Sequence, residues 1–391
     1  MVLGDIHQMR KDLRYVLRIP RRWEGGLRRS AFARNIQGSN SIEGYVVAED
    51  DAAAAIDDER PFSADEKTFL EIQGYRQALG YVLAMSDADY ATFDTTELRA
   101  MHYTMLSHDL AKSPGRYRKG PIYVTDERAE KVVYTAPEAA DVPALMEALA
   151  ATLHTGHGSD PVVRSAMAHL NLVMIHPFRD GNGRTARALG TLVLSRSDIG
   201  EPEFSSIEEW LGANTEDYSS VLAHTGHGSW MPRDDAHLWL AFILRAHHMQ
   251  AQTLARRVAE ADQTWVELEA LTAVHGLPER AQDTMYDAVL GYRTRRSAYM
   301  KRAEVTEQSA TRDLAALTAA GILAAQGSGR GRHYVAGPIL RQIQERRRSA
   351  RRPIRDPYPW MRPTLAPRFY LPDAEALPYL AGTTTIDHQS R

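Results

Sequence analysis

Residues 176–187 read His-Pro-Phe-Arg-Asp-Gly-Asn-Gly-Arg-Thr-Ala-Arg, and the rest of the chain is best understood as support for this stretch. Before it, residues 162–174 carry apolar side chains three and four positions apart, which predicts a helix buried on one side. After it, residues 185–195 are rich in Ala and Leu and predict a second helix. Gly181 and Gly183 end the first helix and let backbone N–H groups converge before the second. Such a turn binds anions, because unpaired N–H groups and the positive end of the helix dipole face the ligand.

The charged side chains of this stretch suit a nucleotide and its metal. Arg184 and Arg187 are three residues apart, so we expect both to project from one helix face toward the same anion. Asp180 offers a hard oxygen ligand beside the turn, which suits Mg²⁺ that bridges phosphate oxygens. The ordinary pKa of a histidine such as His176 suits a general base near neutral pH. We interpret Phe178 as an apolar anchor for the loop.

Two other interpretations of the glycine turn remain open at this point. Residues 181–186 match Gly-x-Gly-x-x-Ala, the degenerate fingerprint of dinucleotide-binding proteins. That fingerprint follows a strand, whereas a helical pattern precedes this one. The other alternative is a helix-turn-helix without a ligand, which does not need so many charged residues.

The stretch resembles the signature of the Fic (filamentation induced by cAMP) family, His-x-Phe-x-Asp/Glu-Gly-Asn-Gly-Arg-x-x-Arg, and every defining position is filled. The resemblance implies a mainly α-helical Fic-type bundle with a short β-hairpin flap. It also implies an adenylyltransferase that moves AMP from ATP to a Ser, Thr or Tyr hydroxyl of a protein. The resemblance implies that His176 is the base that deprotonates the acceptor and that Asp180 is a Mg²⁺ ligand. It also implies that Gly181, Asn182 and Gly183 form a phosphate cradle. Arg184 and Arg187 would then bind the β- and γ-phosphates.

A second motif precedes the signature, at Ser39-Asn-Ser-Ile-Glu43-Gly44. It matches the inhibitory pattern of the family, Ser/Thr-x-x-x-Glu-Gly/Asn, and its position suggests the subgroup with an N-terminal inhibitory helix. The resemblance implies that Glu43 pairs with Arg187. A carboxylate there occupies the donors that the γ-phosphate needs, so ATP binds with its α-phosphate badly placed for attack. The alternative is an ordinary capped helix, because Ser followed four residues later by Glu is common at helix starts.

Two further stretches are expected to contact substrates. Ile122-Tyr123-Val124 and residues 132–134 are short β-rich runs around a polar turn, which predicts a hairpin. In the family this place holds the flap, which binds the target segment by strand-like pairing, although an ordinary surface hairpin fits as well. After the signature, Asn214 and Tyr218 lie one helical turn apart, and in relatives such a pair flanks the adenine. Tyr218 could equally belong to the core.

The C-terminal part has the pattern of a second unit. Residues 305–317 have the shape of a helix-turn-helix with a recognition-like helix, and residues 321–335 predict two strands around a basic turn, so the unit resembles a winged helix. Arg312, Arg330 and Arg332 could contact phosphates, but with a net charge of −3 we favour DNA less than protein as the partner.

These patterns divide the chain into five parts. The chain has no cysteine, which excludes disulfides and thiol catalysis and fits a reducing cytoplasm, and no apolar run is long enough to span a membrane. The parts are an N-terminal segment with the inhibitory helix (1–60), a Fic catalytic domain (61–255), a helical connector (256–276), a winged-helix domain (277–340) and an Arg/Pro-rich tail without a fold of its own (341–391).

Three hypotheses about function follow. The leading one is protein adenylylation that uses ATP and Mg²⁺ and is held low by Glu43, with a homodimer left open. The second is removal of AMP, or transfer of another phosphate-containing group, by the same site. Arg184 directly after Gly183 departs from the kinase-type branch of the family, which has Lys there, and favours nucleotidyl transfer. The third is a DNA-binding regulator in which the Fic core senses nucleotide.

Overall fold

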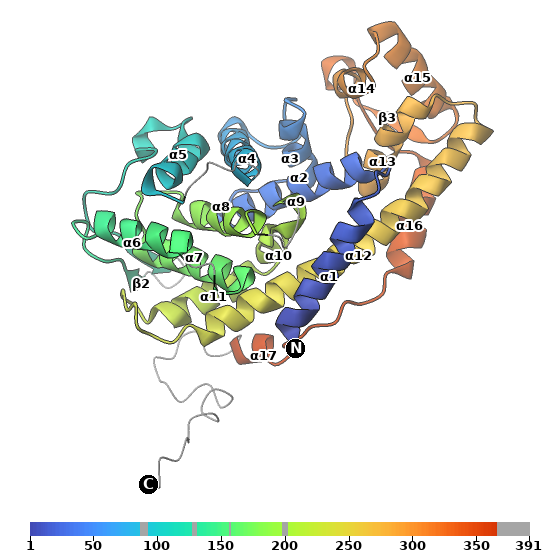
Figure 1. Cartoon of the computed structure of the whole chain (residues 1–391). Helices are drawn as coiled ribbons and strands as arrows, with labels where there is room; N and C mark the ends of the chain where they lie inside the picture. The colour runs from blue at the N-terminus through green and yellow to red at the C-terminus, as the bar shows by residue number, and fades with distance from the viewer. Residues whose placement is uncertain (87–92, 127–130, 156–157, 198–201, 366–391) are drawn as a thin grey trace, which may run out of the picture.

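The computed structural model describes residues 1–86, 93–126, 131–155, 158–197 and 202–365, and these are mainly helical, as the sequence predicts (Figure 1). The helices of the N-terminal and central parts are α1 (Val2–Leu17), α2 (Glu24–Ile42), α3 (Glu49–Ile56), α4 (Glu66–Ser86), α5 (Thr95–Leu106), α6 (Val142–Thr155), α7 (Pro161–Ile175), α8 (Asn182–Ser195), α9 (Pro202–Ser205), α10 (Glu208–Ala213) and α11 (Thr215–Gly226). The remaining helices are α12 (His237–Val274), α13 (Gln282–Leu290), α14 (Arg296–Ala303), α15 (Glu307–Ala319), α16 (Pro338–Ala350) and α17 (Met361–Leu365).

Helices α7 and α8, which flank the signature, form the centre of the larger core. Helix α7 begins at Pro161, whose missing N–H costs nothing at a first helical position, and the Asp160 side chain accepts a hydrogen bond from the N–H of Val162 at 2.8 Å. Helix α8 is buried on all sides from Arg184 to Leu194. It packs against α7, α4 and α5, so three elements of the core hold α8 in place.

The inhibitory motif forms the C-terminal end of α2, and this helix packs against two different cores. Its second half crosses α10 closely, because both helices have glycine at the crossing: a Cβ on Gly212 would lie 2.6 Å from the Cα of Gly38. Its first half packs against α13, where Leu27 joins the same apolar cluster as Tyr286. Arg29 adds a salt bridge from α2 to Asp287 of α13, at 3.0 Å.

Helix α12 connects the central part to the C-terminal part without a break. It has 38 residues, which is about 57 Å at 1.5 Å per residue. Its first turns pack in the cluster around Trp239 and Phe242, whereas its later turns pack in the cluster around Trp265 and Leu268. Helix α1 lies along α12 (Figure 1). The boundary expected at residue 255 and the connector expected over 256–276 thus lie within one continuous helix.

A β-hairpin covers the C-terminal end of α7. Strands β1 (Tyr123–Asp126) and β2 (Lys131–Thr135) pair antiparallel, with Tyr123 opposite Thr135, and the turn expected between them lies outside the described residues. The hydroxyl of Tyr134 donates a hydrogen bond to the carbonyl of Met174 at 2.7 Å and so fastens β2 to α7. Among the described residues, β1 pairs with β2 alone, which leaves its other edge open.

The C-terminal part contains three helices, α13 to α15, followed by the antiparallel strands β3 (Leu323–Gln326) and β4 (His333–Ala336). This order agrees with the elements expected for a winged helix. Helix α16 differs from the expectation of a tail without a fold of its own. Its apolar residues Leu340 and Ile343 are buried, and its arginines pair with acidic residues of α12, as Arg346 does with Glu267 at 2.6 Å.

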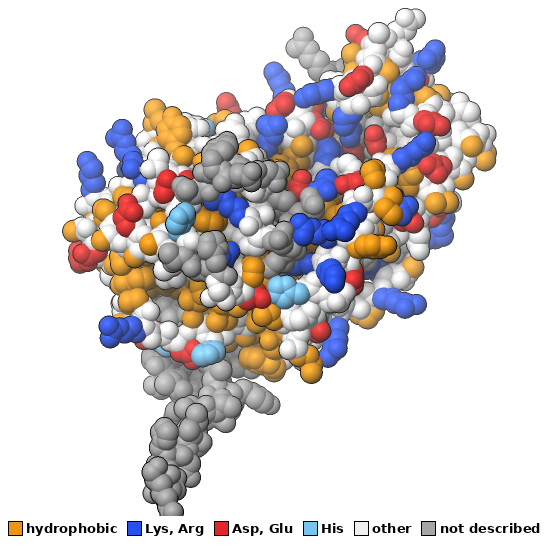
Figure 2. All heavy atoms as spheres, viewed as in Figure 1, with side chains coloured by type: hydrophobic (Ala, Val, Ile, Leu, Met, Phe, Trp, Pro, Cys, Tyr) orange, Lys and Arg blue, Asp and Glu red, His pale blue; other side chains and the backbone are white. Residues whose placement is uncertain are grey.

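The surface is mixed in charge. Figure 2 shows basic and acidic side chains interspersed over one face of the molecule. Across the described residues, none of the helices combines the length and the apolar character that a membrane crossing requires. Of the arginines considered for DNA contact, Arg312 is exposed and lies 3.8 Å from Asp313, and Arg332 lies over the ring of Tyr334. The side chain of Arg330 lies outside the described residues.

Candidate active site

The turn between α7 and α8 begins at His176, whose backbone is in the left-handed region with φ 51°. A non-glycine residue rarely adopts this conformation, so surrounding contacts must hold it. Arg118 supplies them: its Nε donates to the carbonyl of His176 at 2.8 Å, and its N–H donates to the carbonyl of Pro177 at 2.9 Å. Sequence analysis missed Arg118, because its partners lie almost 60 residues away.

The imidazole of His176 is held in the tautomer that a general base needs. Its Nδ1 lies 3.1 Å from the carbonyl of Val173, so Nδ1 carries the proton and Nε2 keeps its lone pair. Burial lowers the pKa of His176, and the Val173 carbonyl only partly opposes this change. The lowered pKa favours the neutral ring, which is able to accept a proton.

The loop is anchored by Phe178, which is fully buried and stacks on the ring of His102 at 3.7 Å between centroids. The N–H of Gly115 donates to Nδ1 of His102, so Nε2 donates to the carbonyl of Asp180 at 2.9 Å. Asn182 closes the loop with two hydrogen bonds of 2.9 Å to the backbone of Phe178. The side chain of Asn182 thus shapes the cradle from within.

Two glycines are required by the geometry of the cradle. Gly181 has φ 77°, and a Cβ there would also lie 2.9 Å from Leu106. At Gly183 a Cβ would lie 2.7 Å from Oε1 of Glu43 and 3.2 Å from Nη1 of Arg187. The carboxylate of Glu43 therefore lies directly over the start of α8, in the position where a glycine turn binds an anion.

Arg187 is paired with Ser39 and Glu43, and Glu43 is the partner that the resemblance implied for it. Its Nη2 donates to Oε1 of Glu43 at 2.6 Å, and Ser39 accepts from Nε at 2.7 Å and, through its carbonyl, from Nη2 at 3.0 Å. Burial opposes the charge of this arginine, but Glu43 raises its pKa above the ordinary value. Gly44 follows with φ 85°, so a glycine ends the helix that carries Glu43.

Arg184 pairs with a different acidic residue from Arg187, and the expectation that both point to one anion stays a prediction. Its side chain is 1% exposed, and Nη1 donates to Oε2 of Glu71 at 2.5 Å. Asp180 lies between this pair and solvent: Oδ1 accepts from the N–H of Gly181 at 2.6 Å, and Oδ2 lies 2.9 Å from Nζ of Lys112. The partly exposed carboxylate of Asp180 fits a Mg²⁺ ion that takes its other ligands from phosphates and water.

Tyr218 lies in the core with its hydroxyl close to Arg187, and its contact with adenine stays a prediction. Its ring is 3% exposed and packs beside Trp239 and Phe242, and its hydroxyl lies 2.8 Å from Nε2 of His169. Spacing along a helix does not say which face is buried, and here the aromatic face turns inward. Asn214 lies at the start of α11, partly exposed, with its amide bonded to the carbonyl of Trp210.

The residues expected in the flap lie at the edge of the site. Tyr123 is 55% exposed, whereas Ile122 and Val124 are partly buried against the cluster that contains Met174 and Trp239. Because β1 has an open edge among the described residues, an extended peptide could pair with it.

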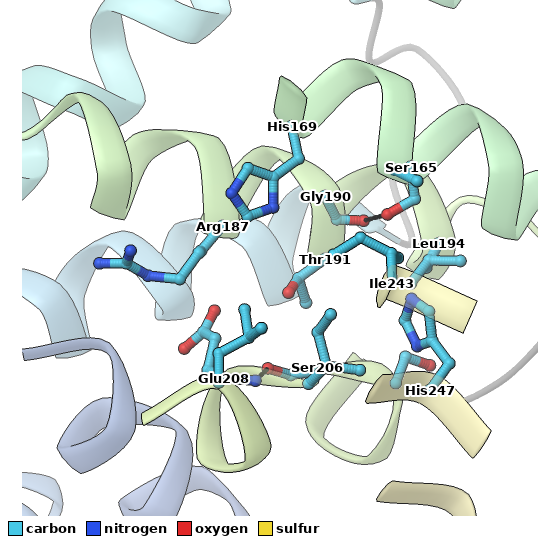
Figure 3. Close-up of a pocket in the computed structure, with 14 residues that line it drawn as sticks. Ser165, His169, Arg187, Gly190, Thr191, Leu194, Ser206, Glu208, Ile243 and His247 are labelled. Atoms are coloured by element: carbon cyan, nitrogen blue, oxygen red, sulfur yellow. Dashed lines mark hydrogen bonds between the residues drawn. The ribbon is translucent and has the colours of Figure 1, made fainter. Parts of the chain in front are cut away.

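A cavity of about 20 Å³ lies behind Arg187, large enough for one water molecule (Figure 3). Arg187, His169, Glu208 and His247 line it. Glu208 is 1% exposed, and burial raises its pKa to about 7, with Tyr75 and Arg187 offsetting part of that effect. This buried acid next to the inhibitory pair gave no signal in the sequence.

Comparisons with known proteins agree with this geometry. Residues 92–194 match the model of the Fic/DOC family. Protein adenylyltransferase Fic of Nematostella vectensis is 29% identical over 209 residues, which cover 52% of this chain and 45% of that protein. The namesake of Drosophila yakuba is 32% identical over 183 residues, or 44% of this chain and 34% of that protein. The chain thus spans less than half the length of these curated relatives.

Solved structures share the fold. A Fic family protein from Desulfovibrio desulfuricans has a TM-score of 0.54 at 24% identity, covering 86% of this chain and 95% of that one. Fic-1 of C. elegans has a TM-score of 0.52 at 21% identity, covering 66% and 72%. The signature geometry, the family model and the shared fold agree. Residues 92–194 therefore form a domain of the Fic/DOC family.

Proposed function

We propose that this protein is a Mg²⁺-dependent protein adenylyltransferase that moves AMP from ATP to a Ser, Thr or Tyr hydroxyl, and that Glu43 inhibits it. The observation that carries the proposal is the ion pair of Glu43 and Arg187 over the glycine cradle, 2.6 Å long and beside a histidine in the base tautomer. The relatives named protein adenylyltransferase support the same reaction.

In this proposal His176 removes the acceptor proton. Its Nε2 is free to accept, because Nδ1 is engaged with Val173. The hydroxyl oxygen then attacks the α-phosphate, the bond to the β-phosphate breaks, and pyrophosphate leaves. Backbone N–H groups at Gly181 to Gly183 and the guanidinium of Arg187 would stabilise the negative charge of the phosphates. Asp180 would hold Mg²⁺, which when bound neutralises phosphate charge.

Inhibition would be a competition for one guanidinium. Arg187 is 3% exposed and already has Ser39 and Glu43 as partners, so a γ-phosphate can reach it only after Glu43 leaves. A charge-assisted hydrogen bond contributes about 1.5–3 kcal/mol, which is roughly 10- to 150-fold in the affinity of a competing ligand. The subgroup with an N-terminal inhibitory helix fits this arrangement.

The partner of the site would be a protein segment that pairs with the open edge of β1 near Tyr123, and Asn214 is proposed to contact the adenine from the start of α11. A homodimer, a cytoplasmic location and DNA contact by the C-terminal part remain predictions.

The test uses purified wild type, Glu43→Gly and His176→Ala with labelled ATP and Mg²⁺. We expect strong self-labelling by Glu43→Gly, weak labelling by wild type and none by His176→Ala. Glu43→Asp is the matched control, because it keeps the charge but shortens the reach to Arg187, and it should label at an intermediate level. Equal labelling by wild type and Glu43→Gly would refute the inhibition, and labelling without His176 would refute the mechanism.

The alternative of AMP removal predicts the opposite role for Glu43. Incubation of pre-labelled Glu43→Gly protein with catalytic wild type separates the two. Release of AMP that requires Glu43 would support removal, and stable label would support transfer.

A further inference from the structure

Lys112 lies in direct contact with the carboxylate expected to hold the metal. It ends the 3₁₀ turn Leu110–Lys112, and Ser113 after it adopts a left-handed conformation with φ 56° that redirects the chain. Its Nζ lies 2.9 Å from Oδ2 of Asp180 and 2.5 Å from Oε1 of Glu71. The side chain is 17% exposed, so most of it is held against the protein.

Both oxygens of Asp180 are therefore engaged. Oδ1 accepts the N–H of Gly181 at 2.6 Å, and Oδ2 lies 2.9 Å from Nζ of Lys112. Mg²⁺ binds carboxylate oxygen at about 2.0–2.1 Å, so an ion on Asp180 would lie close to the ammonium group of Lys112 and be repelled by it. The Lys112–Asp180 contact therefore opposes metal binding.

Glu71 holds Lys112 in this position. Its carboxylate is 2% exposed and bridges two cations, with Oε1 on Lys112 and Oε2 on Arg184 at 2.5 Å. Burial tends to raise the pKa of Glu71, but Arg184 and Lys112 hold it at about 2. Glu71 and Asp180 carry two negative charges and Lys112 and Arg184 two positive ones. The cluster is neutral before any metal or nucleotide arrives.

We propose that Lys112 acts as a tethered cation beside Asp180, so that it competes with Mg²⁺ for this carboxylate and weakens metal binding until it withdraws. The inference rests on the proposed nucleotide site, but it concerns a different control from the Glu43 pair. Glu43 blocks Arg187 at the start of α8, whereas Lys112 blocks Asp180 on the side of Arg184 and α4. Removal of Glu43 therefore leaves the Lys112 control in place.

The experiment compares variants made in a Glu43→Gly parent, with ADP as the probe. ADP affinity is measured by titration calorimetry over a series of Mg²⁺ concentrations and in EDTA. Lys112→Met keeps most of the stem and removes the charge, Lys112→Gln is a second neutral variant in case the first unfolds, and Lys112→Arg keeps the charge. Thermal unfolding verifies that each variant is folded.

We expect the Mg²⁺ concentration for half-maximal enhancement of ADP binding to fall about two- to fivefold in both neutral variants, as for loss of one ion pair. Lys112→Arg should stay near the parent. The affinity for ADP in EDTA should not rise in the neutral variants. A general loosening of the site would change this metal-free affinity as well, so the measurement separates the two effects. An unchanged or higher Mg²⁺ requirement in the folded neutral variants would overturn the inference, whereas a parent that binds no ADP at any Mg²⁺ concentration would refute the nucleotide site itself.

Discussion

Glu208 makes the stability of this protein depend on pH in a direction opposite to most carboxylates. Burial raises its pKa from 4.5 to about 7. Between these values the folded protein keeps a proton that the unfolded chain has lost, so the free energy of unfolding falls as pH rises toward 7 and levels off above it. A shift of about 2.5 units corresponds to roughly 3 kcal/mol, because one unit is worth 1.36 kcal/mol.

The perturbation is Glu208→Gln, which keeps the shape and removes the titration. Thermal or urea unfolding of both proteins is followed by tryptophan fluorescence at pH 5, 6, 7 and 8. We expect wild type to lose roughly 2.5 kcal/mol across this range relative to Glu208→Gln, which is several degrees in the midpoint. His169 and His247 line the same cavity, but they are present in both proteins and cancel in the difference.

The neighbouring acid provides a matched control. Partners, chiefly Arg257, overcome the effect of burial and lower the pKa of Glu209 to about 2. Glu209 therefore stabilises the folded protein fully at any pH above the pKa that it has in the unfolded chain. This stabilisation is lost only at lower pH, as the pH falls through about 2. Glu209→Gln should therefore be less stable than wild type by a constant amount from pH 5 to 8. If Glu208→Gln and wild type also give parallel curves, Glu208 is not a buried neutral acid and the reasoning fails.

Two further predictions concern catalysis and its control. Because burial lowers the pKa of His176, the acid limb of the Glu43→Gly rate profile should have its midpoint below 6.5, and a midpoint at or above 6.5 would contradict the proposed base. A Cβ on Gly38 would overlap the carbonyl of Glu208, so Gly38→Ala should displace α2, raise self-labelling above wild type and cost about 1–3 kcal/mol of stability. Gly25→Ala on the same helix meets no atom within 4 Å and should leave labelling unchanged.

The sequence predicted what depends on neighbours along the chain. The turn from His176 to Gly183 and the two helices around it follow from local periodicity and glycine placement, and the pairing of Glu43 with Arg187 followed from two recognisable motifs. Lys112, Glu71 and Asp180 belong to one cluster, yet Lys112 is 41 residues from Glu71, and no pattern marks either residue. Contacts of this kind depend on how helices pack.

Two features could not be decided from the sequence, for the same reason. Tyr218 shares its helical spacing with Asn214, but only packing against Trp239 shows that its ring turns into the core. In the sequence, the arginines at and after α16 look like a solvent-exposed run of charges. In the structure they pair with acidic residues of α12, which lie about 80 to 90 positions earlier. A charge run in a sequence does not reveal the opposite charges that the fold brings to it.

Helix α2 crosses α10 closely at Gly38, so a movement at one end of α2 tilts its other end about this crossing. At 1.5 Å per residue, Gly26, where α2 meets Tyr286 of α13, lies about 18 Å from Gly38, and Glu43 lies about 7.5 Å from it. A displacement of 1 Å at Gly26 therefore moves Glu43 by roughly 0.4 Å, enough to stretch a hydrogen bond near its optimum. A displacement of α13 would thus reach the carboxylate over the glycine cradle from the far end of the same helix.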